Sequence, residues 1–88
     1  MFYVYILQCG DNTLYTGYTV NIEKRVENHN AGIASKYTRS RLPVKCVYTE
    51  QCSSKSEALK REREIKALTR KQKQALIASY NKTADNSQ

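Results

Sequence analysis

The stretch LYTGYT, Leu14–Thr19, decides the fold of this chain. Its aromatic and β-branched residues favour a β-strand, yet the strand carries a glycine, Gly17, at its centre. Glycine offers a strand no side chain to pack, so a glycine inside a strand often marks a close approach by backbone or ligand. The question is therefore what approaches Gly17.

A segment of similar composition upstream supplies a partner strand. The run FYVYIL, Phe2–Leu7, is separated from residues 14–20 by the turn-forming residues Gly10, Asp11 and Asn12. Two such runs joined by a turn predict a β-hairpin.

The register of this hairpin decides which side chain meets the glycine. Successive side chains of a strand alternate between the two faces of the sheet. If the loop holds an odd number of residues, Tyr5 lies opposite or diagonal to Tyr15 or Gly17. The sequence alone leaves that register open.

The first helix is predicted over Asn21 to Asn30, with Asn21 as its N-cap and Gly32 as its C-terminal stop. Arg25 and His29 are four residues apart, so they share a helix face, beside the apolar pair Ile22 and Val26. A guanidinium suits a phosphate, and an imidazole can relay a proton or hold a phosphate oxygen. An ordinary solvated helix face would show the same residues, so both interpretations stay open.

The later elements follow from composition and capping signals. Residues 34–43, ASKYTRSRLP, predict a basic loop, and Val44–Glu50 predict a third strand. Two capping-box spacings predict helices over Lys55–Leu68 and Arg70–Ser79.

The order strand, strand, helix, strand, helix, helix predicts one α+β domain over residues 1–79. Its sheet is expected to be antiparallel and three-stranded, flanked by about three helices. The polar residues 80–88 are expected to form a flexible tail.

Composition narrows the class of protein. A chain of 88 residues with 40% hydrophobic residues makes one small folded domain. No apolar run approaches the about 20 residues that span a bilayer, and the N-terminal run lacks the features of a signal peptide. Three cysteines without a CxxC pair favour a reducing, cytoplasmic setting and, with a single histidine, disfavour a zinc site.

The net charge of +7 favours a polyanionic partner. Nucleic acid fits this charge better than an anionic membrane surface does. We expect no membrane partner, no small-molecule cofactor and a monomeric protein.

Glu62 is the residue hardest to explain by structure alone. It falls within the apolar stripe of its predicted helix, which is formed by Ala58, Leu59 and Ile65. A carboxylate on a core-facing stripe costs free energy unless it is paired or binds a cation. It could pair with Arg25, reach solvent at the edge of the stripe, or hold a metal ion.

Tyrosines form the last signal, since the chain has seven of them. Strand tyrosines usually pack in the core, but a phenol whose pKa is lowered can act as a general acid or base. Tyr37 lies in the basic loop, where it could stack on a splayed base, with three cations that could guide a strand: Lys36, Arg39 and Arg41.

Together these segments resemble the GIY-YIG nuclease domain, and within it the small single-domain UPF0213, or YhbQ-like, branch. The likeness covers roughly Phe2 to Ile77 and is carried by five runs: YVYIL, LYTGYT, EKRVENHN, KYTRSRLPV and SEALKREREIK. It implies a GIY-YIG endonuclease-like fold, with the active site on one face of the sheet.

The resemblance also implies roles for individual residues. Tyr5 matches the tyrosine of the first motif, and Tyr15 and Gly17 match the second. Arg25 and His29 match the polar positions of the first helix. Glu62 matches the single carboxylate that holds Mg²⁺ or Mn²⁺ in related nucleases.

The implied reaction is phosphodiester hydrolysis, with DNA as the implied substrate. The metal ion would polarise the phosphate, and Arg25 would balance charge in the transition state. A tyrosine would deprotonate the attacking water, with Tyr15 favoured over Tyr5. Because Mg²⁺ keeps several waters and relies on substrate phosphate, one carboxylate implies weak metal binding without nucleic acid.

The chain departs from the family pattern at several positions. Tyr3 and Thr16 replace a glycine and an isoleucine of the two motifs, and Tyr18 stands where some relatives carry lysine. No asparagine follows Glu62 at the position many relatives have one. A catalytically weak nucleic-acid-binding module therefore remains the alternative, ahead of a protein-interaction module.

Overall fold

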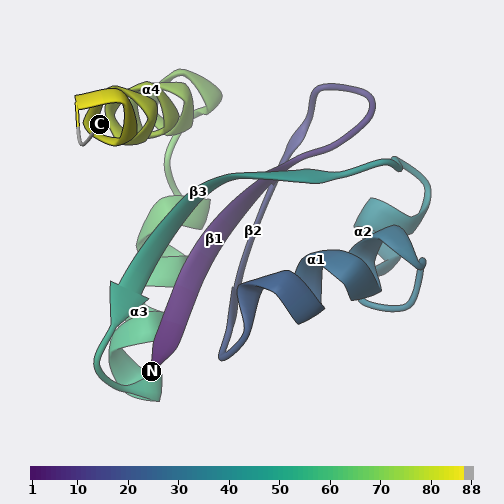
Figure 1. The fold of residues 1–88 in the computed structure, drawn as a ribbon, viewed down its shortest axis with the longest axis horizontal. Coiled ribbons are helices and arrows are strands. Elements are labelled where there is room, and N and C mark those ends of the chain that lie inside the picture. The colour runs from purple at the N-terminus through teal and green to yellow at the C-terminus, as the bar shows by residue number, and fades with distance from the viewer. Residues whose placement is uncertain (87–88) are drawn as a thin grey trace.

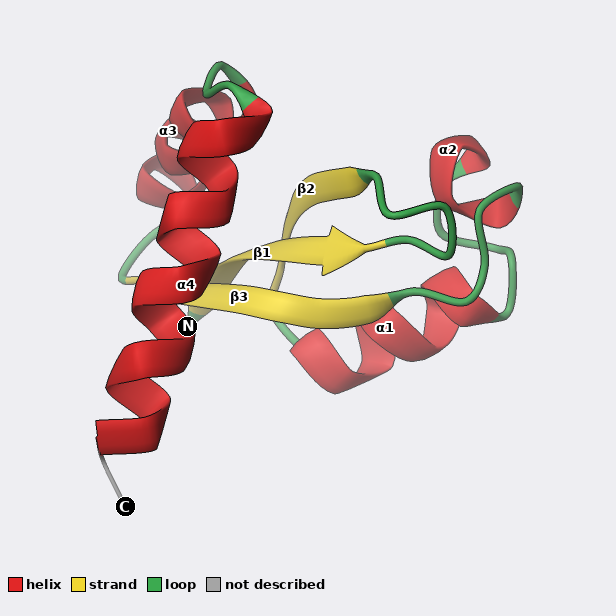
Figure 2. Ribbon diagram, turned by 90° about the horizontal axis from the view of Figure 1, so that it is seen from above, coloured by secondary structure: helices red, strands yellow, loops and turns green. Residues whose placement is uncertain are grey.

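The computed structural model describes residues 1–86, which form an α+β fold of three strands and four helices (Figures 1 and 2). In chain order the elements are β1 Phe2–Gln8, β2 Leu14–Thr19, α1 Ile22–Asn30, α2 Lys36–Arg39, β3 Lys45–Cys52, α3 Lys55–Lys66 and α4 Arg70–Asn86.

The sheet is antiparallel, with β1 between β2 and β3. In the β1–β2 hairpin Tyr5 pairs with Gly17, and Leu7 pairs with Tyr15. Tyr5 is thus opposite the glycine and diagonal to the second tyrosine. The predicted hairpin and its odd loop are confirmed.

The two faces of β1 belong to two separate cores. Val4 and Ile6 pack with Ala58 and Ile65 of α3. Tyr5 and Leu7 face the other way, into a core that α1 covers with Ile22 and Val26. The ribbon shows α1 and α3 on opposite sides of the sheet (Figure 1). Alternation along one strand therefore separates the structural core from a face rich in tyrosine.

The predicted caps are present. Asn21 caps α1 by accepting a hydrogen bond from the amide of Lys24, and Gly32 follows the helix with a φ of +80°. At the start of α4 the capping box is complete. The amide of Gln72 donates to the hydroxyl of Thr69, and the amide of Thr69 donates to the side chain of Gln72.

Several boundaries differ from the sequence prediction, and α3, for example, ends at Lys66 instead of Leu68. The basic loop contains the short helix α2, because Ser35 caps it by accepting from the amide of Tyr37. Strand β3 continues to Cys52 beside β1. Helix α4 continues beyond Ser79 to Asn86. The flexibility expected of residues 80–88 stays a prediction, and residues 87–88 lie outside the described part of the chain.

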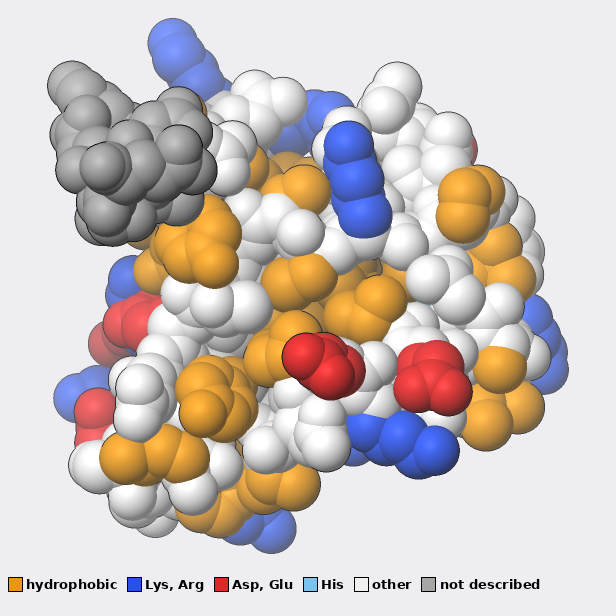
Figure 3. Space-filling model, viewed as in Figure 1, with side chains coloured by type: hydrophobic (Ala, Val, Ile, Leu, Met, Phe, Trp, Pro, Cys, Tyr) orange, Lys and Arg blue, Asp and Glu red, His pale blue; other side chains and the backbone are white. Residues whose placement is uncertain are grey.

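Two further features concern the surface. Over the residues that the structure describes, no helix is both long and apolar enough to cross a membrane. The face shown in Figure 3 carries dispersed lysine and arginine side chains among hydrophobic, acidic and neutral groups, not one continuous basic patch.

Candidate active site

The side chain that approaches Gly17 is that of Tyr5. A Cβ atom at position 17 would lie 2.6 Å from the Tyr5 hydroxyl oxygen and 2.7 Å from Cζ. The ring of Tyr5 therefore occupies the space that the glycine leaves open. The close approach at Gly17 is real, but it serves a tyrosine of the neighbouring strand.

Tyr5 is joined to His29 of α1. The Tyr5 hydroxyl lies 3.0 Å from Nε2 of His29, and Nδ1 of His29 lies 2.7 Å from Oγ1 of Thr38 in α2. Tyr5 is 1% exposed and both partners are fully buried. The hairpin, α1 and α2 thus meet in one buried polar chain.

Burial keeps the two titratable side chains of this hydrogen-bonded series, Tyr5 and His29, neutral near pH 7. It raises the pKa of Tyr5 well above its ordinary value; the Tyr15 and Glu62 side chains add to this effect, and Arg25 opposes it. Burial also lowers the pKa of His29, and the positive charge of Arg25 lowers it further. Tyr5 is therefore held as a phenol, and His29 as an uncharged imidazole.

Tyr15 lies at the centre of the aromatic cluster. Its ring centroid is 6.5 Å from that of Tyr5, 5.2 Å from that of His29 and 5.9 Å from that of Tyr37. Tyr15 is only partly buried, whereas Tyr5 is closed to solvent. Of the two motif tyrosines, Tyr15 is the one that solvent can reach.

Glu62 lies at the edge of the α3 stripe. Its side chain is 17% exposed, and it pairs with Lys66 at 3.6 Å. The ion pair with Arg25 that the sequence left open is not formed in the described residues. Leu59 is 36% exposed, so it does not belong to the core that Ala58 and Ile65 form. The charge of Glu62 raises the pKa of Tyr5 and that of Arg25 lowers it, so both side chains lie near enough to affect Tyr5 electrostatically.

The part of the chain that contains these residues is similar to a known protein family. A family model described as the GIY-YIG catalytic domain matches residues 1–75. The chain belongs to the GIY-YIG family. That stretch contains every residue of the candidate site, from Tyr5 to Glu62.

Curated relatives in this family are UPF0213 proteins. Those of Natronomonas pharaonis and Staphylococcus haemolyticus are 58% and 59% identical to the chain, over 86% and 85% of its length and 89% and 92% of theirs. That of Clostridium perfringens is 55% identical over 98% of this chain and 92% of its own.

Two solution NMR structures share the fold. The UPF0213 protein from Bacillus halodurans is 44% identical, with a TM-score of 0.57 over 89% of this chain and 84% of that one. A protein from E. faecalis is 42% identical, with a TM-score of 0.60 over 90% and 84%. The predicted family and fold class are both confirmed.

The donor atoms at this GIY-YIG site suit a hard cation held loosely. No group of three or more histidine, cysteine or acidic side chains capable of holding a metal occurs in the described part of the chain. Glu62 brings one carboxylate, which among the described residues is engaged only by the 3.6 Å pair with the mostly exposed Lys66. Such a single carboxylate would fit Mg²⁺ or Mn²⁺ if water molecules and a substrate phosphate supplied the remaining ligands.

Arg25 also borders an open cleft at the end of the sheet. The cleft has a volume of about 360 Å³ and is lined by Phe2, Tyr18, Thr19, Val20, Arg25 and Lys55. Neither cation has an ion-pair partner within the described residues. Sequence reasoning missed Lys55, because it lies thirty residues beyond Arg25 (55 − 25) and only the fold brings the two together.

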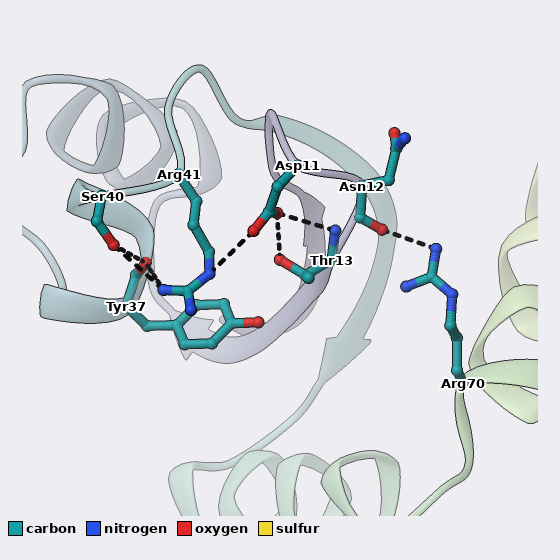
Figure 4. Close-up of polar contacts among 7 residues, drawn as sticks. All are labelled: Asp11, Asn12, Thr13, Tyr37, Ser40, Arg41 and Arg70. Carbon is teal, nitrogen blue, oxygen red and sulfur yellow. Dashed lines mark hydrogen bonds and ion pairs between the residues drawn. The ribbon is translucent and has the colours of Figure 1, made fainter.

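The cations of the basic loop do not act as one group. The Arg41 guanidinium lies 3.9 Å above the Tyr37 ring and 3.1 Å from the carboxylate of Asp11 (Figure 4). Tyr37 also stacks on Tyr15. A base can therefore stack on Tyr37 only if these contacts rearrange. Lys36 and Arg39 are exposed.

Proposed function

We propose that the protein is a divalent-metal-dependent endonuclease that hydrolyses phosphodiester bonds in DNA. The observation that supports the proposal is that Tyr15 packs near Tyr5 and that the charges of Arg25 and Glu62 both act on Tyr5, from four different elements of the fold. A guanidinium, a carboxylate and a phenol are the groups that phosphodiester hydrolysis uses for charge balance, metal binding and proton transfer.

Arg25 receives the phosphate. Its side chain borders the cleft with Lys55 and has no carboxylate partner among the described residues, so its charge is available to an anion. Glu62 is the residue that would hold Mg²⁺ or Mn²⁺, and the bound ion would supply polarisation of the phosphate.

Tyr15 serves as the base for the attacking water. It keeps part of its surface open to solvent, whereas Tyr5 is buried with its hydroxyl against His29. The pKa of Tyr5 is raised, so its phenol ionises less readily than an ordinary tyrosine does. Tyr5 and His29 therefore serve as buried residues that position the site and do not act as the base.

The net charge of +7 supports DNA as the polyanion, and Lys36 and Arg39 are exposed on α2. Sequence-specific binding is not expected, because phosphate contacts position a protein without reading bases. The three cysteines are free thiols. A cytoplasmic location and a monomeric state stay predictions.

The test compares purified wild-type protein with Glu62→Ala and Arg25→Ala. Each is incubated with branched, nicked and single-stranded DNA and with RNA, in Mg²⁺, Mn²⁺ or EDTA. We expect metal-dependent nicking that Glu62→Ala abolishes while DNA binding survives. Cleavage that persists unchanged in Glu62→Ala would refute the assignment of this site.

The second candidate is a nucleic-acid-binding module without useful catalysis. Its support is the complete burial of Tyr5 and His29, since a purely structural aromatic cluster would also bury them. Binding of DNA without cleavage of any substrate, in either metal, would favour this candidate.

A further inference from the structure

Thr38 lies within the run KYTRSRLPV but has no assigned role in the site, although it is fully buried against His29. We infer that Thr38 is a positioning residue that holds His29 as the tautomer protonated on Nδ1. In this state Nε2 is an acceptor, so the Tyr5 hydroxyl must point its proton at His29. The effect on DNA cleavage rests on the proposed function, but the tautomer itself does not.

Three contacts in series carry the inference. Tyr5 Oη lies 3.0 Å from His29 Nε2, and His29 Nδ1 lies 2.7 Å from Thr38 Oγ1. Thr38 Oγ1 in turn donates to the backbone carbonyl of Ser35, 3.4 Å away. A carbonyl oxygen can only accept, so this last contact gives the chain its direction.

With Nδ1 protonated, each of the three donors in this hydrogen-bonded series has an acceptor. Nδ1–H donates to Thr38, Thr38 donates to Ser35, and Tyr5 donates to Nε2. With Nε2 protonated, His29 would donate to Tyr5 instead. The Tyr5 proton would then lack a partner in the described residues, on a side chain that is 1% exposed. An unpartnered buried donor is costly, so the first arrangement is favoured.

Local structure explains why Thr38 can act in this way. In a helix, a threonine hydroxyl commonly donates to the carbonyl three or four residues earlier, which leaves its oxygen free to accept. The Ser35 carbonyl also accepts from the amide of Arg39, and the amide of Arg41 donates to the Thr38 carbonyl. These bonds fix the backbone on both sides of Thr38 in α2.

The arrangement sets what Tyr5 can offer to the site. Because its proton is committed to His29, only the lone pairs of the Tyr5 oxygen face the site. Tyr5 then accepts hydrogen bonds there and does not donate them. Loss of the tautomer would let Tyr5 turn its proton outward and compete for the base or the phosphate.

The chain has one histidine, so the tautomer can be measured without ambiguity. The full-length protein is labelled with ¹⁵N in its histidine ring, and the two nitrogen shifts are measured by NMR near pH 7. We expect a protonated Nδ1 and a bare Nε2 in the wild type. Thr38→Val removes the acceptor and should change the tautomer ratio by about tenfold or more, whereas Thr38→Ser should retain it.

The matched control is Thr16→Val. Thr16 is a buried threonine on the other face of the hairpin, and its hydroxyl has no partner in the described residues. It should leave the histidine shifts unchanged. A wild-type protein protonated on Nε2, or a Thr38→Val protein that is folded with an unaltered tautomer, would overturn the inference.

Cleavage kinetics provide the second readout. Thr38→Val should lower kcat by about tenfold with KM for DNA little changed, and Thr38→Ser should restore it. Unchanged kcat in a Thr38→Val protein whose tautomer has shifted would overturn the role in cleavage. If the wild type does not cleave DNA at all, the proposed function fails while the NMR result still decides the tautomer.

Discussion

At the scale of single residues, Gly17 and Tyr5 constrain each other across the hairpin. A Cβ atom at position 17 would lie 2.6 Å from the Tyr5 hydroxyl, far inside contact distance. Gly17→Ala should therefore displace the Tyr5 ring, break its bond to His29, and lower the free energy of unfolding by about 1–3 kcal/mol. Urea unfolding measures this loss. Its cause is tested in a Tyr5→Ala background, where Gly17→Ala should change the free energy of unfolding very little. An equal loss of stability in both backgrounds would refute the explanation.

His29 and Tyr5 also give the fold a definite response to pH. The pKa of His29 is lowered from 6.5, chiefly by burial, so below about pH 6.5 the unfolded chain binds a proton that the folded protein resists. Stability should be complete above that value and fall as pH falls towards the lowered pKa. At high pH the raised pKa of Tyr5 acts in the opposite sense, so stability should fall again above about pH 10.

Urea unfolding between about pH 5 and 8 tests the acid limb. His29 is the one histidine of the chain, and histidine is the side chain whose ordinary pKa falls within this range. His29→Gln should therefore flatten the slope. A slope unchanged in His29→Gln would assign it to another group.

At the scale of elements, the sequence predicts what local chemistry decides. The strands, the N-cap Asn21 and the capping box at Thr69 depend on neighbours in the chain, and all were predictable. Helix α2 was not, because four residues carry no periodic pattern and their stability depends on Ser35 and on the contact of Thr38 with His29. The role of Lys55 was not predictable either, because tertiary structure alone brings it to the cleft that Arg25 borders.

Helix α2 gives an element-scale prediction. Ser35 caps it by accepting a hydrogen bond from the amide of Tyr37 at 3.1 Å. Ser35→Ala should reduce the free energy of unfolding by about 1 kcal/mol, as loss of an N-cap does, and Ser35→Gly by less. Thermal unfolding measures both, with the exposed Ser40→Ala at the other end of α2 as the control. A Ser35→Ala protein as stable as the wild type would mean that tertiary contacts alone hold α2.

At the scale of the whole molecule, the two ends of the sheet have different surroundings. At one end the hairpin loop is held by Asp11 against Arg41 and by the Asn12 carbonyl, which accepts from Arg70 at 2.7 Å (Figure 4). At the other end, where β1 begins and β2 ends, Arg25 and Lys55 border an open cleft without ion-pair partners in the described residues. Charged groups of the hairpin-loop end already have partners, whereas the unpaired cations at the other end are available to a polyanion.

This asymmetry predicts which lysine matters for DNA binding. Each phosphate that a cation neutralises adds about 0.7–0.9 to the slope of log affinity against log salt. Lys55→Ala should weaken binding of a labelled DNA and reduce that slope by about 1, with the protein fold unchanged. Lys71→Ala is the matched control, because Lys71 follows Arg70 in α4, whose start contacts the hairpin loop at the opposite end of the sheet. Equal losses in the two variants would mean that DNA follows the diffuse charge of +7 and not the cleft beside Arg25.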